Sequence, residues 1–454
     1  MTARASNVLS DPRAVHIVAA SLLATALILR LVAIEHYPYQ AINDARNYLN
    51  SAHAIARYGT YHDGNHAAGG ARGPSAYFPP AYAYLLSIAD KLTGGPALGT
   101  DTVHLARIMQ ALLGTVTVAL IGMIALDLFG AGTALLALAI AAIYPVFIEL
   151  SSVLVAENLL TVLELAAVYT ALRCRRTGTP TRWVVGTGIL VGLAALTHTN
   201  AALMIIPLAF AMAGIPLRQR LATVPGRARL AAPATMVVVA LLTVTPWLIR
   251  DTVVFHHFVP ISTEAGITLA GTYNATSAAS YPPYRWLYFA TVASLRDLHR
   301  DAARMTELQL DQKLEHRALA YVEHNPLAPI SVAFHNTLRL LELEGSRAWQ
   351  ISSASVGIDL SLAHVGVFSF WLLLALALAG LATRQVRQAL GRAPRWLCGV
   401  PFVMWLTVVL VNAETPRFRE PLDPFLILLA AVTLAAVCRR LRTRQPPAVA
   451  ELTA

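Results

Sequence analysis

Residues 44–82 contain three short motifs of polar and aromatic residues: DARNY at 44–48, GTY at 59–61 and SAYFPPAY at 75–82. They follow directly on a first long apolar segment, so we expect this stretch to leave the membrane where that segment ends. A carboxylate (Asp44), two arginines (Arg46 and Arg72), several tyrosines and a rigid Pro-Pro pair would then lie beside the bilayer. Charge next to lipid is costly unless it has a partner or a function, so this stretch is a candidate functional site.

The composition indicates an integral membrane protein. Of 454 residues, 56% are hydrophobic and only 13% are charged, whereas soluble domains carry about 25% charged residues. The net charge of +10 does not point to a nucleic-acid partner, because the basic residues cluster in short loops between apolar runs, as the orientation rule for membrane proteins predicts. The three cysteines are scattered and give neither a disulfide framework nor a zinc pattern.

Ten apolar stretches approach the length of about 20 residues that a helix needs to cross a bilayer. They are residues 14–35, 103–128, 130–149, 153–173, 183–198, 200–215, 231–249, 362–383, 396–412 and 421–438. Every arginine-rich short loop follows an even-numbered stretch, which predicts that these loops and both termini are cytoplasmic. The two stretches between 183 and 215 are short and are separated by a polar break.

We therefore predict an all-α polytopic membrane protein with about ten transmembrane helices in one domain, residues 1–438. A disordered cytoplasmic tail is expected at 439–454. Two external loops, 36–102 and 250–361, are long enough to carry helices of their own. The pattern predicts an interfacial helix at 79–92 in the first loop, and helices at 304–324 and 329–344, separated at Pro326, in the second.

Asp44 lies shortly after the first span, on the external side. Two compatible roles are open to it. It could cap a helix over residues 45–58, as aspartate often does. It could also act as a base, because a carboxylate within hydrogen-bond reach can take a proton from a hydroxyl. If the segment is helical, Tyr48 lies one turn further along on the same face.

Glu149 and Glu157 flank the turn between the third and fourth spans, and Glu164 lies deeper, on the same helical face as Glu157. An acid just inside the mouth of a span suggests a function. It can equally complement the dipole at the start of a helix. Both interpretations of Glu157 stay open at this point. Because Glu164 would be costly against lipid, it is expected to face a polar cavity.

Arg250, Arg417 and Arg419 lie at the external mouths of spans, where the charge rule predicts few arginines. The planar guanidinium of arginine suits a phosphate held by two hydrogen bonds, so a lipid phosphate could bind at this depth. Alternatively, these arginines could pair with nearby acids, or reach the lipid headgroups. The nearby acids are Glu414, Glu420 and Asp423.

The ordered set of motifs resembles the polyprenyl-phosphate-dependent glycosyltransferases of the GT-C class. An Asp-x-x-x-Tyr after the first span, a Gly-x-Tyr and a Tyr-Phe-Pro-Pro-x-Tyr are similar to the opening of the glycosyltransferase family 39-like group, which includes protein O-mannosyltransferases and aminoarabinose transferases. The matches extend in order from about residue 30 to 437. Later motifs that agree are AENLLT at 156–161, TPWLIR at 245–250, VPIST at 259–263 and PRFREP at 416–421.

The resemblance implies a GT-C-type bundle with external loop helices. It implies that Asp44 is the catalytic aspartate and that Glu157 assists acceptor or metal binding, with Mg²⁺ or Mn²⁺ as the candidate cofactor. The predicted donor phosphate-binding residues are Arg250, Arg417, Arg419 and Arg72. The predicted substrate pocket contains Tyr48, Tyr77, Tyr82 and Arg46.

Two positions depart from the narrower families. Aminoarabinose transferases carry a basic residue directly before the Pro-Pro pair, where this chain has Phe78. Protein O-mannosyltransferases have a second acid directly after the aspartate, where this chain has Ala45. These two positions argue against both narrower assignments within the class.

The expected function is transfer of a sugar, with inversion, from a polyprenyl-phosphate donor to a hydroxyl at the outer face of the cell membrane. The acceptor could be a glycolipid, a polysaccharide or a protein. One alternative is a transporter or flippase of a lipid-linked sugar, which inverted repeats and broken helices at matching places would favour. Another is a polymerase or ligase of lipid-linked oligosaccharides, which would place its main polar loop late in the chain.

Overall fold

The computed structural model describes residues 11–61, 74–177, 181–213, 226–413 and 416–443, and every regular element within these ranges is a helix. The predicted all-α class is confirmed. Asp11 begins the first helix, α2 (Pro12–His36), by accepting a hydrogen bond from the backbone of Arg13. Its 25 residues give a length of about 37 Å, enough to cross a bilayer.

Each predicted span coincides with a helix or a broken pair of helices. They are α2, α5 (Thr100–Phe129), α6 (Ala131–Ile143) with α7 (Pro145–Ser152), α8 (Glu157–Arg176), α9 (Thr181–Ala195), η1 (Thr199–Met204) with α10 (Ile205–Met212), α11 (Gly226–Phe255), α18 (Leu360–Leu381), α20 (Trp396–Val411) and α21 (Asp423–Thr443). Within the described residues, five single helices are long and apolar enough to cross a membrane, or six with the bent pair. The chain is thus a multi-pass membrane protein, and the count of ten spans is not confirmed.

Two features of the spans differ from the prediction, one a bend and the other a helix end. The span expected at 130–149 is bent by 50° between α6 and α7, because Pro145 has no N–H to continue the helix ladder. Helix α21 continues to Thr443, beyond the predicted end of the transmembrane domain at residue 438. The remainder of the predicted tail, 444–454, lies outside the described residues.

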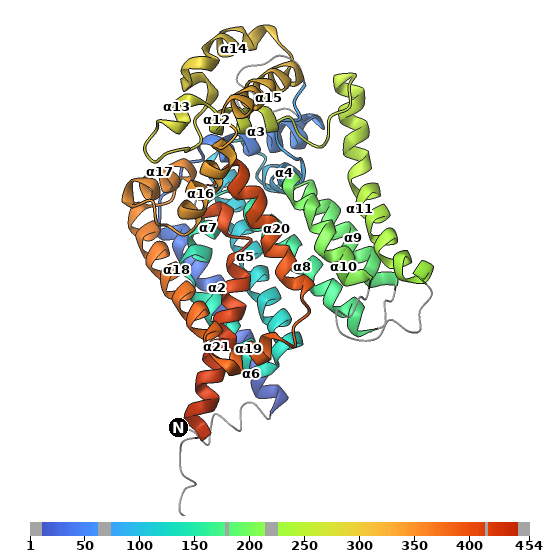
Figure 1. The fold of residues 1–454 in the computed structure, drawn as a ribbon, viewed down its shortest axis with the longest axis vertical. Coiled ribbons are helices and arrows are strands. Elements are labelled where there is room, and N and C mark those ends of the chain that lie inside the picture. Colours follow the sequence, from blue (N-terminus) through green and yellow to red (C-terminus); the bar gives the residue numbers. More distant parts are fainter. Residues whose placement is uncertain (1–10, 62–73, 178–180, 214–225, 414–415, 444–454) are drawn as a thin grey trace, which may run out of the picture.

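The helices of the two external loops gather at the end of the bundle opposite the N-terminus (Figure 1). The first loop contributes α3 (Asn43–Tyr58) and α4 (Ala81–Thr93). The second contributes α12 (Ala265–Thr272), α13 (Ala275–Ala278), α14 (Arg296–Asp301), α15 (Glu307–His324), α16 (Ala328–Leu340) and α17 (Ser346–Val356), with short 3₁₀ turns η2 (Phe289–Thr291), η3 (Ala293–Leu295) and η4 (Ala302–Arg304). The remaining elements are α19 (Arg384–Leu390) and η5 (Arg417–Arg419).

Helix α3 is positioned by an apolar stripe and by one buried acid. Its buried side chains recur at helical spacing and pack against α4. Asp90 of α4 accepts a hydrogen bond from His53 at 2.8 Å and lies 3.6 Å from Arg57. Helix α3 ends at Gly59 in the left-handed conformation, with φ of 67°. These contacts fix the helix that carries Asp44 and Tyr48.

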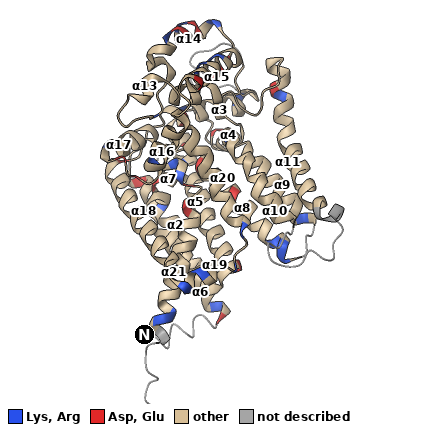
Figure 2. Ribbon diagram, in the orientation of Figure 1, with Lys and Arg blue, Asp and Glu red and all other residues tan. Residues whose placement is uncertain are grey.

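Many Lys and Arg residues lie at the end of the bundle that carries α19 and the last turns of α21, and others lie at the opposite end, around α14 (Figure 2). Arginines of three of the predicted even-numbered loops lie in the last turn of α8, on α19 and on α21. These three loops, which the sequence places on one side, lie at one end of the molecule, and residues 214–225 of the fourth lie outside the described residues. Their assignment to the cytoplasm stays a prediction.

Gly266 gives a test of the packing between α12 and α15. A Cβ at this position would lie 2.1 Å from the backbone oxygen of Asp311, whose carboxylate accepts a hydrogen bond from the Gly266 N–H at 2.6 Å. Gly266→Ala should therefore destabilise the protein by about 1–3 kcal/mol, as overpacking does. The control is Gly186→Ala in α9, where a Cβ meets nothing within 4 Å. Thermal unfolding in detergent measures both, and equal unfolding temperatures for the two variants would contradict the packing described.

Candidate functional site

The centre of the candidate site is an ion pair between the first and last external loops. Arg417 donates a hydrogen bond from Nη1 to Oδ2 of Asp44 at 2.7 Å. Helix α3 begins at Asn43, and its N-cap, Ile42, makes no side-chain cap. Asp44 therefore lies within the first turn and does not cap the helix. The Asp44 side chain is 40% exposed and that of Arg417 only 14%, so this acid is reachable from outside and its partner is largely enclosed.

Glu157 holds the other side of Arg417. It is the first residue of α8 and is buried. Its Oε1 lies 3.8 Å from Nε of Arg417 and 3.6 Å from Nε2 of His198. The guanidinium of Arg417 thus lies between two carboxylates from different helices. The structure brings together three of the residues that the sequence singles out, Asp44, Glu157 and Arg417.

Glu264 is a member of this group that the sequence analysis did not identify. It directly precedes α12 and follows the VPIST motif, so an acid beside that motif was the available signal. The pKa of Glu264 is raised to about 7, because burial and the nearby Asp44 raise it by more than His198 and Arg417 lower it. The preceding residue is fixed, because the Thr263 N–H donates to the backbone oxygen of Ala76 at 2.9 Å. Glu264 therefore interacts with the charges of Asp44 and Arg417, and the residue before it is hydrogen-bonded to the first loop.

An aromatic cluster lies under Asp44. Tyr48 stacks on Phe78 with ring centroids 4.4 Å apart and meets Tyr82 edge-on at 4.8 Å, and Tyr77 meets Phe78 edge-on at 4.7 Å. All four rings are buried. Burial raises the pKa of Tyr48 and of Tyr77, with Asp44 adding to the effect, so both stay protonated. The three tyrosines predicted in the substrate pocket, Tyr48, Tyr77 and Tyr82, therefore belong to one packed aromatic cluster next to Asp44.

The other two residues predicted at the first loop are placed differently. Arg46 is exposed on α3. Arg72 lies outside the described residues.

Arg250 binds the first loop. It donates to the backbone oxygens of Ser75 at 2.7 Å and Tyr61 at 3.1 Å, and pairs with Asp251 at 2.7 Å. Its guanidinium also lies over the rings of Trp247 and Tyr61, at 4.8 and 5.6 Å from their centroids. These contacts tie loop segments on both sides of residues 62–73 to α11.

Arg419 points into the protein. It is 2% exposed, donates to Glu342 at 2.7 Å and lies 3.3 Å from Asp423. Burial alone would lower the pKa of Arg419, but the carboxylates of Asp423 and Glu342 raise it above its ordinary value. Its partners are therefore protein acids, which is the alternative that the sequence analysis left open.

The two further acids of the third and fourth predicted spans are separated. Glu149 lies on α7 and lines a small pocket together with Glu342 and Arg419. Glu164 lies on α8 and is fully buried, and neither of its carboxylate oxygens has a hydrogen-bond partner among the described residues. The shared polar cavity expected for Glu157 and Glu164 stays a prediction.

The resemblance implies a Mg²⁺ or Mn²⁺ site, which would need several His, Cys, Asp or Glu side chains close together. Among the described residues, no three His, Cys, Asp or Glu side chains are grouped so that they could hold an ion. The positive charge between Asp44 and Glu157 is the guanidinium of Arg417. The described side chains therefore do not form a ready Mg²⁺ or Mn²⁺ site.

The helical bundle and its external helices have the GT-C fold. The oligosaccharyltransferase of Archaeoglobus fulgidus in the apo form aligns with 94% of this chain and 51% of its own, with a TM-score of 0.55 and 14% identity. The same enzyme, AglB, in complex with an inhibitory peptide and a dolichol-phosphate, aligns with 94% and 51%, with a TM-score of 0.52 and 15% identity. Its complex with Zn and sulfate gives 93% and 50%, with a TM-score of 0.53 and 15% identity.

This chain thus spans about half the length of that oligosaccharyltransferase. ArnT from Cupriavidus metallidurans bound to undecaprenyl phosphate aligns with 94% of this chain and 81% of its own, at 16% identity, but its TM-score of 0.41 is too low to carry an argument. Residues 78–249 match the family described as dolichyl-phosphate-mannose-protein mannosyltransferase. No protein of curated function matches the sequence significantly. The resemblance to the GT-C glycosyltransferases is therefore confirmed in the fold and over this segment.

The raised pKa of Glu264 predicts that the stability of the protein depends on pH. Its pKa in the folded protein, about 7, lies above the ordinary value of 4.5, so the folded state favours the protonated acid. Its contribution to stability is complete below pH 4.5 and is lost as the pH rises through 7. Glu264→Gln should therefore be more stable than the wild type at pH 8, by about 1–2 kcal/mol after allowance for solvent screening.

Thermal unfolding of both proteins at pH 4 and pH 8 measures this difference. Glu35→Gln is the control, because Glu35 is an exposed acid. An equal gap between Glu264→Gln and the wild type at the two pH values would show that Glu264 titrates normally.

Proposed function

We propose that this protein is an integral-membrane glycosyltransferase that moves a sugar from a polyprenyl-phosphate donor to an acceptor hydroxyl at the outer membrane face, with inversion. The observation that carries the proposal is the 2.7 Å pair between Asp44 and Arg417. It joins a solvent-reachable carboxylate, which can act as a base, to an enclosed guanidinium, which can bind a phosphate. Both come from loops at the end of the bundle that the sequence predicts to be external (Figure 1).

The pair suggests how one site serves both substrates. An oxygen of the donor phosphate would take the place of the Asp44 carboxylate on Arg417, because a guanidinium binds either anion through the same N–H groups. Asp44 is then released toward the acceptor. The acceptor oxygen forms a bond to the anomeric carbon while the bond from that carbon to the phosphate oxygen breaks. The hydroxyl proton passes to Asp44, and the polyprenyl phosphate leaves on Arg417.

Glu157 and His198 would keep Arg417 in place during this exchange. Glu157 is buried and lies within 4 Å of both Arg417 and His198. When Asp44 turns to the acceptor, Arg417 still has an acid behind it, so its charge is not left without a counter-ion in a poorly solvated place. We therefore propose that Glu157 positions Arg417. His198 and Glu264 would then lie beside the acceptor.

The comparisons support the class of donor. AglB has been solved with a dolichol-phosphate, and the family that matches residues 78–249 is described as using dolichyl-phosphate-mannose. We infer a polyprenyl-phosphate sugar for this chain from these relatives together with Arg417. The acceptor, whether glycolipid, polysaccharide or protein, is left open by the site as described.

Asp44→Asn tests the base. The amide can still accept a hydrogen bond from Arg417 but cannot take a proton, so we expect transfer to fall by about 100-fold or more while donor binding is kept. Transfer of labelled sugar from a polyprenyl-phosphate donor in membranes measures it. Asp101→Asn, an exposed acid in the first turn of α5, is the matched control and should transfer normally. Near-normal transfer by Asp44→Asn would remove Asp44 from the chemistry, whereas a lack of transfer by the wild type would favour the transporter alternative.

Arg417→Lys tests the phosphate site. Lysine keeps the charge but loses the planar fork, so the Michaelis constant for the donor should rise about ten-fold or more. Arg317→Lys is the control, because Arg317 makes an equally short pair of 2.7 Å with Asp297 on the exposed surface of α15. Donor titrations at saturating acceptor give both constants. If the two variants have the same donor constant as the wild type, Arg417 does not hold the phosphate.

A further inference from the structure

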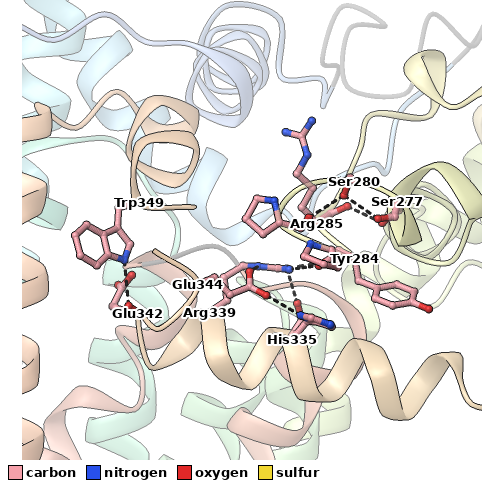
Figure 3. A network of polar contacts seen from close by, with 12 residues as sticks. Ser277, Ser280, Tyr284, Arg285, His335, Arg339, Glu342, Glu344 and Trp349 are labelled. Carbon is pink, nitrogen blue, oxygen red and sulfur yellow. Dashed lines mark hydrogen bonds and ion pairs between the residues drawn. The ribbon is translucent and has the colours of Figure 1, made fainter. Parts of the chain in front are cut away.

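The turn between α16 and α17 carries two acids that point to opposite sides (Figure 3). Glu344 reaches Arg339 and His335, at 2.6 and 2.9 Å. Glu342 reaches Arg419 at 2.7 Å. The backbone of Glu342 is in the left-handed region, with φ of 60°, and its carbonyl accepts a hydrogen bond from the indole of Trp349 at 3.2 Å. The turn therefore holds both carboxylates in fixed and separate directions.

On one side, the turn is joined to residues 283–284, an earlier part of the second external loop. Arg339 donates to the backbone oxygens of Pro283 at 2.6 Å and Tyr284 at 3.3 Å, as well as to Glu344. Both Arg339 and Glu344 are nearly inaccessible to solvent. Hydrogen bonds between charged groups in such surroundings are stronger than neutral ones. The loop at 283–284 is thus rigidly connected to the turn.

On the other side, the turn is joined to the motif that contains Arg417. Arg419 donates to Glu342 and to the backbone oxygen of Leu340 at 3.1 Å, and its guanidinium lies 3.7 Å from the centre of the Phe370 ring. Asp423, at the start of α21, is its second acid, at 3.3 Å. All of these charged groups are buried. We call Glu342, Arg419 and Asp423 the clasp.

Arg417 and Arg419 are the two ends of one 3₁₀ turn, η5. With about three residues per turn, side chains two positions apart point in different directions. Arg419 enters the clasp, and Arg417 turns to Asp44 and Glu157. Fixing one end of so short a turn fixes the direction of the other.

We propose that the clasp positions Arg417 against Asp44, so that Arg419 and Glu342 are positioning residues of the candidate active site, and that the turn at 341–345 connects residues 283–284 of the second external loop to Arg417. This rests on the proposed function only for its effect on transfer. The placement of Arg417 can be tested without any substrate.

The substrate-free test is modification of Arg417 by phenylglyoxal in the full chain in nanodiscs, followed by mass spectrometry. In the wild type Arg417 is largely enclosed and paired. Glu342→Gln should release η5 and increase the rate of modification at Arg417 by about five-fold or more, as should Asp44→Asn, which weakens the pair itself. Glu35→Gln, an exposed acid elsewhere, should leave the rate unchanged.

A second variant of the clasp keeps the proposal testable if Glu342→Gln does not fold. Arg419→Lys keeps a positive charge between Glu342 and Asp423 but loses the planar fork, and it should also increase the labelling of Arg417. Gel filtration confirms that each protein is folded before labelling. An unchanged rate at Arg417 in a folded Glu342→Gln or Arg419→Lys protein overturns the proposal.

The second readout is transfer. Glu342→Gln should lower kcat/KM for the donor by about ten-fold with the acceptor KM unchanged, and should lower it by less than about two-fold when Arg417 is already Lys, because the clasp acts through Arg417. Effects that multiply would indicate a general structural role and overturn the proposal. If the wild type transfers no sugar while the labelling result holds, the proposed function fails and the clasp stands.

Discussion

The site depends on one electrostatic constraint, which is that a poorly solvated arginine must be balanced by acids. Arg417 is largely enclosed at one end of a membrane bundle, between Asp44 and Glu157. Leaving a charge unpaired there would be costly. Since Asp44 belongs to the first loop and Arg417 to the last, this single requirement joins two loops that are far apart in the sequence. The same requirement leaves a carboxylate and a guanidinium in direct contact.

The two arginines of the PRFREP motif show how partners separate roles that residue type does not. Arg417 faces an acid that is exposed enough to be exchanged for a ligand. Arg419 faces acids that are buried with it, so exchange would expose uncompensated charges. One arginine is therefore suited to binding and the other to holding structure, although they are two residues apart. Arg250 follows the second pattern, with backbone oxygens of the first loop as its partners.

The sequence alone was enough for the helical class and for the helices that coincide with the predicted spans, because apolar length is a local feature. The contact of Asp44 and Glu157 with Arg417 agrees with the family resemblance, which places all three in one site, and their roles stay a prediction. Long-range pairing is not local, so the burial of Arg419 with Glu342 could not be read from its motif. Glu264 was missed because an acid after VPIST has no periodicity to mark it. The bend at Pro145 was missed because the apolar run continues through it, and the number of membrane crossings is not fixed by helix positions.

The central claim is that Arg417 exchanges Asp44 for the phosphate of a lipid. The most direct measurement is a cryo-electron microscopy structure of the full chain in nanodiscs with undecaprenyl phosphate. The account predicts density for the phosphate within hydrogen-bond distance of Arg417, with the Asp44 carboxylate moved away from the guanidinium and Arg419 still paired with Glu342. A phosphate bound elsewhere, with the pair between Asp44 and Arg417 intact, would contradict it.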